Sequence, residues 1–163
     1  NDGLHGARTK CGTRTLRKGL HRVLTYGFQR GGGAYQTLRY KGPDTKGSLR
    51  YMQSNQRRRR RTRRHRGFTM RVWKSSVKNM SRIPAKYWKQ KFIGKRVVSR
   101  VNFRSRNTFR RKIRKTPKNH YIWEFKGTVK IRKAGKYTFC SRSDDGSRIK
   151  IDGSQIVNND GLH

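Results

Sequence analysis

The sequence predicts an all-β protein, and three observations support this fold class. Apolar residues alternate with basic or polar residues in several short stretches, as in strands that bury one face. Glycine clusters and Asp-Gly or Pro-Asp pairs, which favour turns, separate these stretches. Helical periodicity is weak throughout, and the best short helix candidate covers only residues 84–90 (PAKYWKQ).

The N-terminal block contains two predicted strands, at residues 14–28 and 34–40. The three glycines at positions 31–33 separate these strands. A Pro-Asp turn follows within residues 38–47. We therefore expect strand, turn and strand in this block.

The C-terminal block contains two predicted hairpins. The first covers residues 127–140, where alternating apolar residues flank a KAGK turn. The second covers residues 147–157 and turns at Asp152-Gly153, a pair that favours tight hairpin turns. The large aromatic residues of this block alternate as core residues do: Trp123, Phe125, Tyr137 and Phe139.

The charge of the chain is strongly positive, with 45 Lys and Arg against 7 Asp and Glu and a net charge of +38. Residues 45–123 contain 28 of these bases and no acid. Like charges at this density resist compaction, so we expect residues 52–66 to form a flexible basic linker. The same density predicts a polyanion partner, bound by Arg57, Arg58, Arg59, Arg60, Arg61, Arg63, Arg64 and Arg66. No apolar run approaches the roughly 18 residues of a spanning helix, so no membrane span is predicted.

A five-residue repeat occupies both ends of the chain, because NDGLH stands at residues 1–5 and again at 159–163. Such an identity is improbable by chance. It predicts either one period of a tandem array plus an overlap, or a domain opened at an inner loop. We favour the tandem array.

Several segments together resemble the protective-antigen 14-kDa domain family. Residues 133–139 (KAGKYTF) and 143–163 (beginning SDDGSRIKIDG) are similar to its first half. Residues 1–44, with NDGLH, GGGA and a final Tyr-x-Gly-Pro-Asp, look like its second half. VNFRSRNTF and IWEFKG, in residues 101–127, are similar to the segment before the family's first hairpin. The resemblance implies an antiparallel, jelly-roll-like β-sandwich with its halves in permuted order.

The expected organisation is therefore the second half of the sandwich at residues 1–51, the basic linker at 52–66 and the first half at 67–163. Three arrangements satisfy this order. The halves close on each other in one chain, belong to successive repeats, or complete the sandwich of a neighbouring copy. An open half would expose sheet edges and an apolar face, so each half needs a partner.

The resemblance also implies a sugar-binding site. In sugar-binding members of the family an Asp-Asp pair holds calcium, and the matching residues here are Asp144 and Asp145. Calcium prefers about six to eight oxygen ligands, which suits two adjacent carboxylates. The second binding loop matches residues 29–34, with Gln29, Gly31, Gly32 and Gly33, but it lacks the Asn or Asp that would complete a metal shell. The alternative is a turn whose carboxylates cap backbone N–H groups.

Other candidate sites are a disulfide, a glycosylation site and a catalytic centre. Cys11 and Cys140 are the only cysteines and form either one disulfide or two buried thiols. Asn79 begins the only N-glycosylation triplet, Asn79-Met80-Ser81. Few acids and no supporting nucleophile motif leave little for acid–base catalysis, so no enzyme is predicted.

Two function classes follow. The first is an extracellular or cell-surface β-sandwich repeat that assembles with copies of itself into arrays or filaments and binds glycans or an acidic polysaccharide matrix. The second is an intracellular polyanion-binding protein, such as a ribosome-associated one, because affinity for phosphates scales with neutralised charge. The terminal β blocks favour the first class, and nucleic acid is the less favoured partner.

Overall fold

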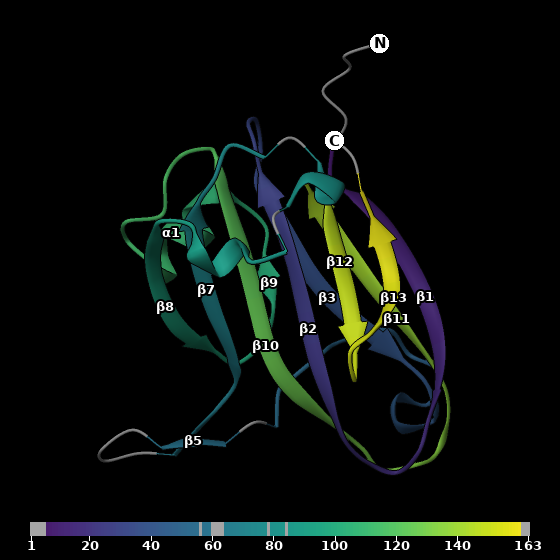
Figure 1. The fold of residues 1–163 in the computed structure, drawn as a ribbon. Coiled ribbons are helices and arrows are strands. Elements are labelled where there is room, and N and C mark those ends of the chain that lie inside the picture. Colours follow the sequence, from purple (N-terminus) through teal and green to yellow (C-terminus); the bar gives the residue numbers. More distant parts are fainter. Residues whose placement is uncertain (1–5, 56, 60–63, 78, 84, 161–163) are drawn as a thin grey trace.

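Eleven strands form two antiparallel sheets that face each other, so the antiparallel β-sandwich is confirmed (Figure 1). The structure is a computed structural model that describes residues 6–55, 57–59, 64–77, 79–83 and 85–160. The described residues contain one α-helix, α1 (Arg106–Lys112), which the sequence did not predict. None of the described helices is long and apolar enough to cross a membrane.

The first sheet has five strands. In spatial order they are β1 (Arg8–Leu16), β11 (Gly135–Asp144), β3 (Tyr35–Lys41) and β4 (Arg50–Tyr51), with β9 (Asn102–Phe103) also on β3. The second sheet has six strands. Their order is β13 (Ser154–Asn159), β12 (Ser147–Ile151), β2 (Gly19–Gln29), β10 (Tyr121–Ile131), β7 (Phe68–Lys74) and β8 (Phe92–Val98).

The N-terminal and C-terminal blocks pair within this one chain. β11 lies between β1 and β3, and β2 lies between β12 and β10, so each sheet takes strands from both blocks. Cys11 and Cys140 face each other across the β1–β11 pair and form a disulfide, with their Cα atoms 4.1 Å apart. Of the three arrangements, the structure therefore has the one in which both halves close on each other.

The two predicted hairpins have different outcomes. β12 pairs with β13, and Asp152 and Gly153 turn with positive φ values of 50° and 89°, as predicted. β10 and β11 are strands but lie in different sheets, so the hairpin predicted at residues 127–140 is wrong. Alternation identifies which side chains are buried, but it does not identify the neighbouring strand.

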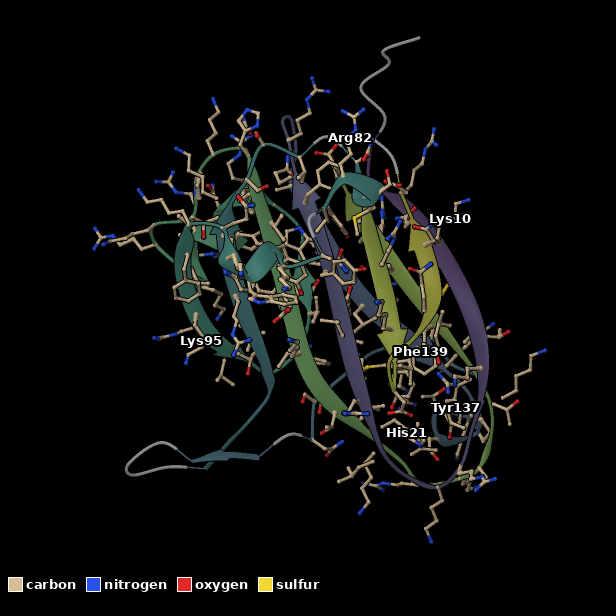
Figure 2. All side chains as sticks on the ribbon, in the orientation of Figure 1. Lys10, His21, Arg82, Lys95, Tyr137 and Phe139 are labelled. Carbon is tan, nitrogen blue, oxygen red and sulfur yellow. A yellow bond between two sulfur atoms is a disulfide. The ribbon has the colours of Figure 1, made fainter. Side chains whose placement is uncertain are left out.

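The core lies between the sheets and contains the four aromatic residues predicted for it: Trp123, Phe125, Tyr137 and Phe139. Figure 2 shows Tyr137 and Phe139 inside, whereas Lys10, Arg82 and Lys95 project outward. A second apolar cluster, with Tyr26 and Trp73, lies beneath η2 (Met80–Arg82) and η3 (Tyr87–Lys89). The helix candidate at residues 84–90 is thus only a short 3-10 turn, in which Tyr87 is buried and Trp88 is 55% exposed.

The segment expected to be a flexible linker begins inside the sandwich. Met52 is fully buried, and the Ser54 hydroxyl accepts the backbone N–H of Thr128 at 3.2 Å. Beyond it, β5 (Arg57–Arg59) pairs with β6 (Arg64–Arg66). Charge repulsion is thus offset by apolar burial at one end and backbone pairing at the other. Arg60, Arg61 and Arg63 lie outside the described residues, as does most of the terminal repeat.

Candidate functional site: two loops at one end of the sandwich

The two loops that the family resemblance singled out meet at one end of the sandwich. The Asp-Asp loop, residues 144–146, joins β11 to β12, and the glycine-rich loop, residues 30–34, joins β2 to β3. The β11–β3 register places Asp144 opposite Tyr35, and the β12–β2 register places Ser147 opposite Gly27. Strand pairing in both sheets therefore brings the loops together.

Direct contacts join the two loops. The backbone N–H of Arg30 donates to Asp145 Oδ2 at 2.7 Å. A Cβ added at Gly33 would lie 2.9 Å from Asp144 Oδ2, so a side chain at this position would require the Asp144 carboxylate to shift. The loops thus form one site, with the Asp144-Asp145 peptide bond in the cis form.

The acidic pair is buried, with Asp144 8% and Asp145 3% exposed. Burial, together with the charge of Asp145, raises the pKa of Asp144 to about 7. Asp144 Oδ1 has no hydrogen-bond partner. A buried carboxylate oxygen that lacks a partner, beside a second carboxylate, is stabilised either by protonation or by a bound cation.

Gln29 supports the glycine-rich loop from the end of β2. Its Nε2 donates to the carbonyls of Gly31 and Gly33, each at 2.5 Å, while its Oε1 is buried without a partner. The Arg106 guanidinium donates to the carbonyl of Gly32 from the other side. The loop is therefore held at all three glycines.

Tyr121 is a residue of this region that sequence reasoning missed. Its hydroxyl is buried without a hydrogen-bond partner. Burial raises its pKa, and the nearby charges of Asp145 and Asp144 add to this effect while Arg106 opposes it. Tyr121 opens β10 and has the pattern of a core residue, so no signal in the sequence distinguishes it.

The donor set fits a calcium ion in its chemistry. Asp144 and Asp145 supply carboxylates, and the unpartnered oxygens of Gln29 and Tyr121 are neutral donors in the same region. Within the described part of the chain, no three His, Cys, Asp or Glu side chains cluster. The remaining ligands of a calcium ion would therefore be neutral oxygens from the chain, water or a ligand.

The other predicted site residues lie elsewhere. Asn79 caps η2, and its Oδ1 accepts the N–H of Arg82 and the hydroxyl of Ser81, each at 2.9 Å. Within the basic stretch, Arg57–Arg59 and Arg64–Arg66 form the separate β5–β6 pair.

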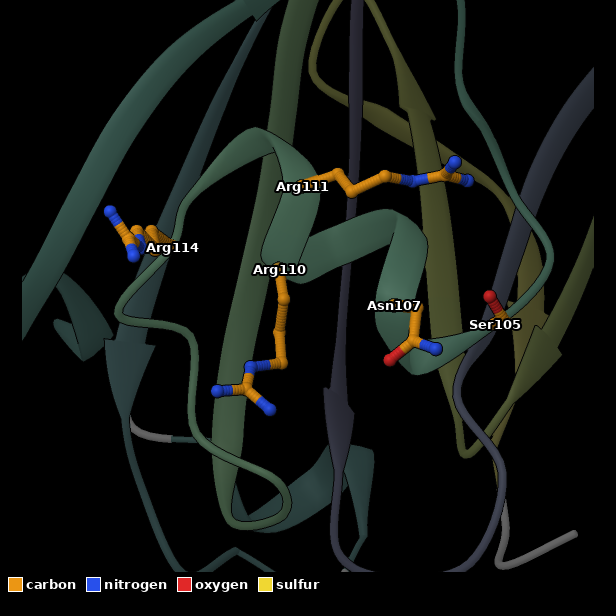
Figure 3. A pocket seen from close by; sticks show the side chains of 5 residues that line it. All are labelled: Ser105, Asn107, Arg110, Arg111 and Arg114. Atoms are coloured by element: carbon orange, nitrogen blue, oxygen red, sulfur yellow. The ribbon is translucent and has the colours of Figure 1, made fainter.

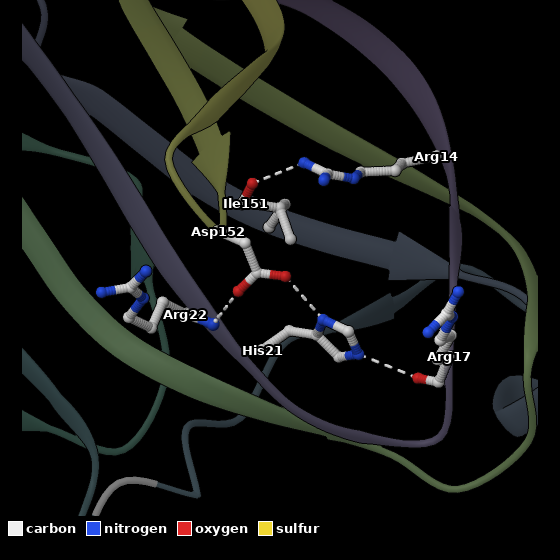
Figure 4. A network of polar contacts seen from close by, with 6 residues as sticks. All are labelled: Arg14, Arg17, His21, Arg22, Ile151 and Asp152. Atoms are coloured by element: carbon white, nitrogen blue, oxygen red, sulfur yellow. Dashed lines mark hydrogen bonds and ion pairs between the residues drawn. The ribbon is translucent and has the colours of Figure 1, made fainter.

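An additional polar network closes the opposite end of β12 (Figure 4). Asp152 Oδ2 accepts a hydrogen bond from His21 Nδ1, and Asp152 Oδ1 accepts one from the backbone N–H of Arg22, each at 2.7 Å. Burial opposes ionisation of Asp152, but the hydrogen bonds from His21 and Arg22 and the charge of Arg14 lower its pKa overall. This network fixes the β12–β13 turn to the start of β2.

Comparison with known proteins agrees with the C-terminal resemblance. Residues 90–163 match the family model described as the PA14 domain. The matched segment contains the Asp-Asp loop but not the glycine-rich loop. Among curated proteins and among solved structures, no match to the chain was found.

Proposed function

We propose that the chain is a non-catalytic carbohydrate-binding module that uses calcium at the Asp-Asp loop, because residues 90–163 match the PA14 domain model. PA14 domains are a carbohydrate-binding and adhesin-type family, typical of secreted or surface proteins. The observation that carries the proposal is the meeting of the two loops around a buried Asp144 oxygen that has no partner.

Each residue of the site has a role in this proposal. Asp144 and Asp145 would hold the ion, which when bound supplies a positive centre for sugar hydroxyls. Gln29 keeps the glycine-rich loop in place through its two carbonyl contacts. The missing side chain at Gly33 leaves room beside Asp144.

The disulfide supports the proposed extracellular or surface location. Disulfides persist in oxidising compartments and are rare in the cytosol. Cys11 and Cys140 join neighbouring strands from the two blocks, so the bond links the blocks within the five-stranded sheet.

The test measures calcium and sugar binding by the full chain. Isothermal titration calorimetry with calcium, and a glycan array read with calcium or with a chelator, are applied to wild type and to the double variant Asp144→Asn, Asp145→Asn. The matched control is Asp152→Asn, which removes an acid from the opposite end of β12. We expect the double variant to lose both calcium binding and sugar binding, and we expect Asp152→Asn to retain both. Sugar binding that survives both the chelator and the double variant would reject the site.

Assembly into arrays or filaments is a separate part of the proposal. The terminal repeat supports it, because one period of a tandem array plus an overlap would carry the same segment at both ends. Negative-stain images of native material test it. Long regular fibres are expected, and dispersed single particles at high concentration would contradict assembly.

A further inference from the structure

A cluster of arginines gathers around Tyr51 at the edge of the five-stranded sheet. Arg39 lies opposite Tyr51 in the β3–β4 register, Arg104 follows β9, and Arg100 precedes it. Their guanidinium carbons lie 4.6 Å (Arg39), 5.8 Å (Arg100) and 5.9 Å (Arg104) from the centre of the Tyr51 ring. Three positive charges thus surround one phenol.

Hydrogen bonds hold two of these arginines in place. Arg39 donates to the Tyr51 hydroxyl at 2.9 Å, and Arg104 donates to the same oxygen and to Asn102 Oδ1 at 3.2 Å. Burial opposes ionisation of Tyr51, but these hydrogen bonds and charges lower its pKa overall. The phenol thus positions charges that would otherwise repel each other.

In the described part of the chain, no ion pair with a carboxylate is found for Arg39, Arg100 or Arg104. The ion pairs among the described residues involve His21, Arg71 and Lys126, none of which belongs to this cluster. Like charges held this close are unfavourable unless an external anion joins them. The cluster is therefore organised for a negatively charged ligand.

Two surface hollows continue the cluster. A hollow of about 380 Å³ is lined by Arg100, Asn102 and Arg111, and one of about 710 Å³ by Arg110, Arg111 and Arg114. Arg111 lines both. We call the arginines of the Tyr51 cluster and of the two hollows together the arginine track: Arg39, Arg100, Arg104, Arg110, Arg111 and Arg114.

The arrangement suits a chain of anions. Figure 3 shows the guanidinium groups of Arg110, Arg111 and Arg114 spread around α1 and the turn after it, without meeting at one point. A single small anion contacts only a few of them, whereas an extended polymer reaches them in succession. Guanidinium groups bind planar or tetrahedral oxyanions through paired hydrogen bonds.

We propose that the arginine track binds an acidic sulfated polysaccharide through residues other than the Asp-Asp pair. Nucleic acid fits less well, because single strands need exposed aromatic faces for base stacking. The guanidinium groups already lie over Tyr51, and Phe103, the aromatic residue lining the smaller hollow, is buried. The disulfide also favours an extracellular ligand.

The test uses a heparin-derived octasaccharide as probe and a single-stranded RNA octamer as comparison. The track variant is Arg100→Gln, Arg104→Gln, Arg111→Gln. The matched control is Arg8→Gln, Arg17→Gln, Arg82→Gln, which removes the same charge from exposed positions elsewhere. We expect the track variant to bind heparin about tenfold more weakly, and the control to remain within about twofold of wild type.

A charge-neutral variant makes the test independent of net charge. Tyr51→Phe removes the hydroxyl that positions Arg39 and Arg104, and we expect it to weaken heparin binding severalfold at unchanged net charge. The double Asp144→Asn, Asp145→Asn variant should keep heparin binding. Equal losses in track variant and control would overturn the proposal. The proposal would also be overturned if the RNA octamer bound more tightly than the heparin octasaccharide and lost affinity in the track variant to the same extent.

Discussion

Replacing Asp144 by Asn distinguishes a ligand-holding carboxylate from a turn-capping one. Asn has nearly the same shape but no charge. If Asp144 is held for a cation, its ionised form destabilises the metal-free protein, because burial and Asp145 disfavour the charge. If it caps the turn, the variant loses a favourable contact instead.

The magnitude follows from the pKa of Asp144, which rises from 3.8 to about 7 on folding. Because the pKa of Asp144 is higher in the folded protein than in the unfolded chain, the neutral carboxyl stabilises the fold relative to the ionised carboxylate. This stabilisation is fully present below pH 3.8 and is lost as pH rises through about 7. The shift corresponds to about 4 kcal/mol at most, from about 1.36 kcal/mol per unit. Solvent at the loop surface screens part of this charge, so we expect about 2 kcal/mol.

The assay is urea unfolding in chelator at about pH 8 and about pH 3.5. We expect Asp144→Asn to be more stable than wild type by about 2 kcal/mol at the higher pH and equal to it at the lower pH. Asp152→Asn is the matched control, and we expect it to be less stable than wild type at the higher pH, whereas Asp144→Asn is more stable. The pKa of Asp152 is lowered by its partners, so its contribution is present at the higher pH and is lost as pH falls through that pKa.

Calcium adds a second measurement. We expect calcium at about pH 8 to stabilise wild type but not Asp144→Asn, because a ligand that binds only the folded state stabilises it. If Asp144→Asn is instead destabilising at about pH 8, in the same sense as Asp152→Asn, the carboxylate caps the turn and the reasoning is refuted.

Three further predictions concern the framework of the site, and each is measured by chemical unfolding. The double variant Cys11→Ser, Cys140→Ser should lose about 2–5 kcal/mol, because the bond closes a loop with a sequence separation of 129; unchanged stability would contradict this. Gly27→Ala should cost about 1–3 kcal/mol or more, since its Cβ would lie 2.3 Å from a backbone oxygen of the Asp-Asp loop, and wild-type stability would argue against that contact. Tyr87→Phe should cost about 1.5–3 kcal/mol, because it removes a donor to the buried Glu124; a neutral effect would show that Glu124 finds another partner.

The loops of the candidate site could be predicted in part. The Asp-Asp pair and the glycine-rich loop were identified because family motifs and turn residues are local patterns. That the loops touch, and that Tyr121 lies within the influence of both carboxylates, depends on pairing between strands distant in the chain, such as Asp144 with Tyr35 and Tyr121 with Gln29.

Local sequence patterns were sufficient to predict the fold class, the β12–β13 turn and the aromatic core, because alternation and turn preferences act over a few residues. Three features depend on the tertiary structure: β10 and β11 lie in different sheets, Met52 is buried, and Tyr51 contacts arginines from two segments distant in the chain. Strand pairing and burial depend on contacts between residues distant in the chain, and local preferences are compatible with many such pairings.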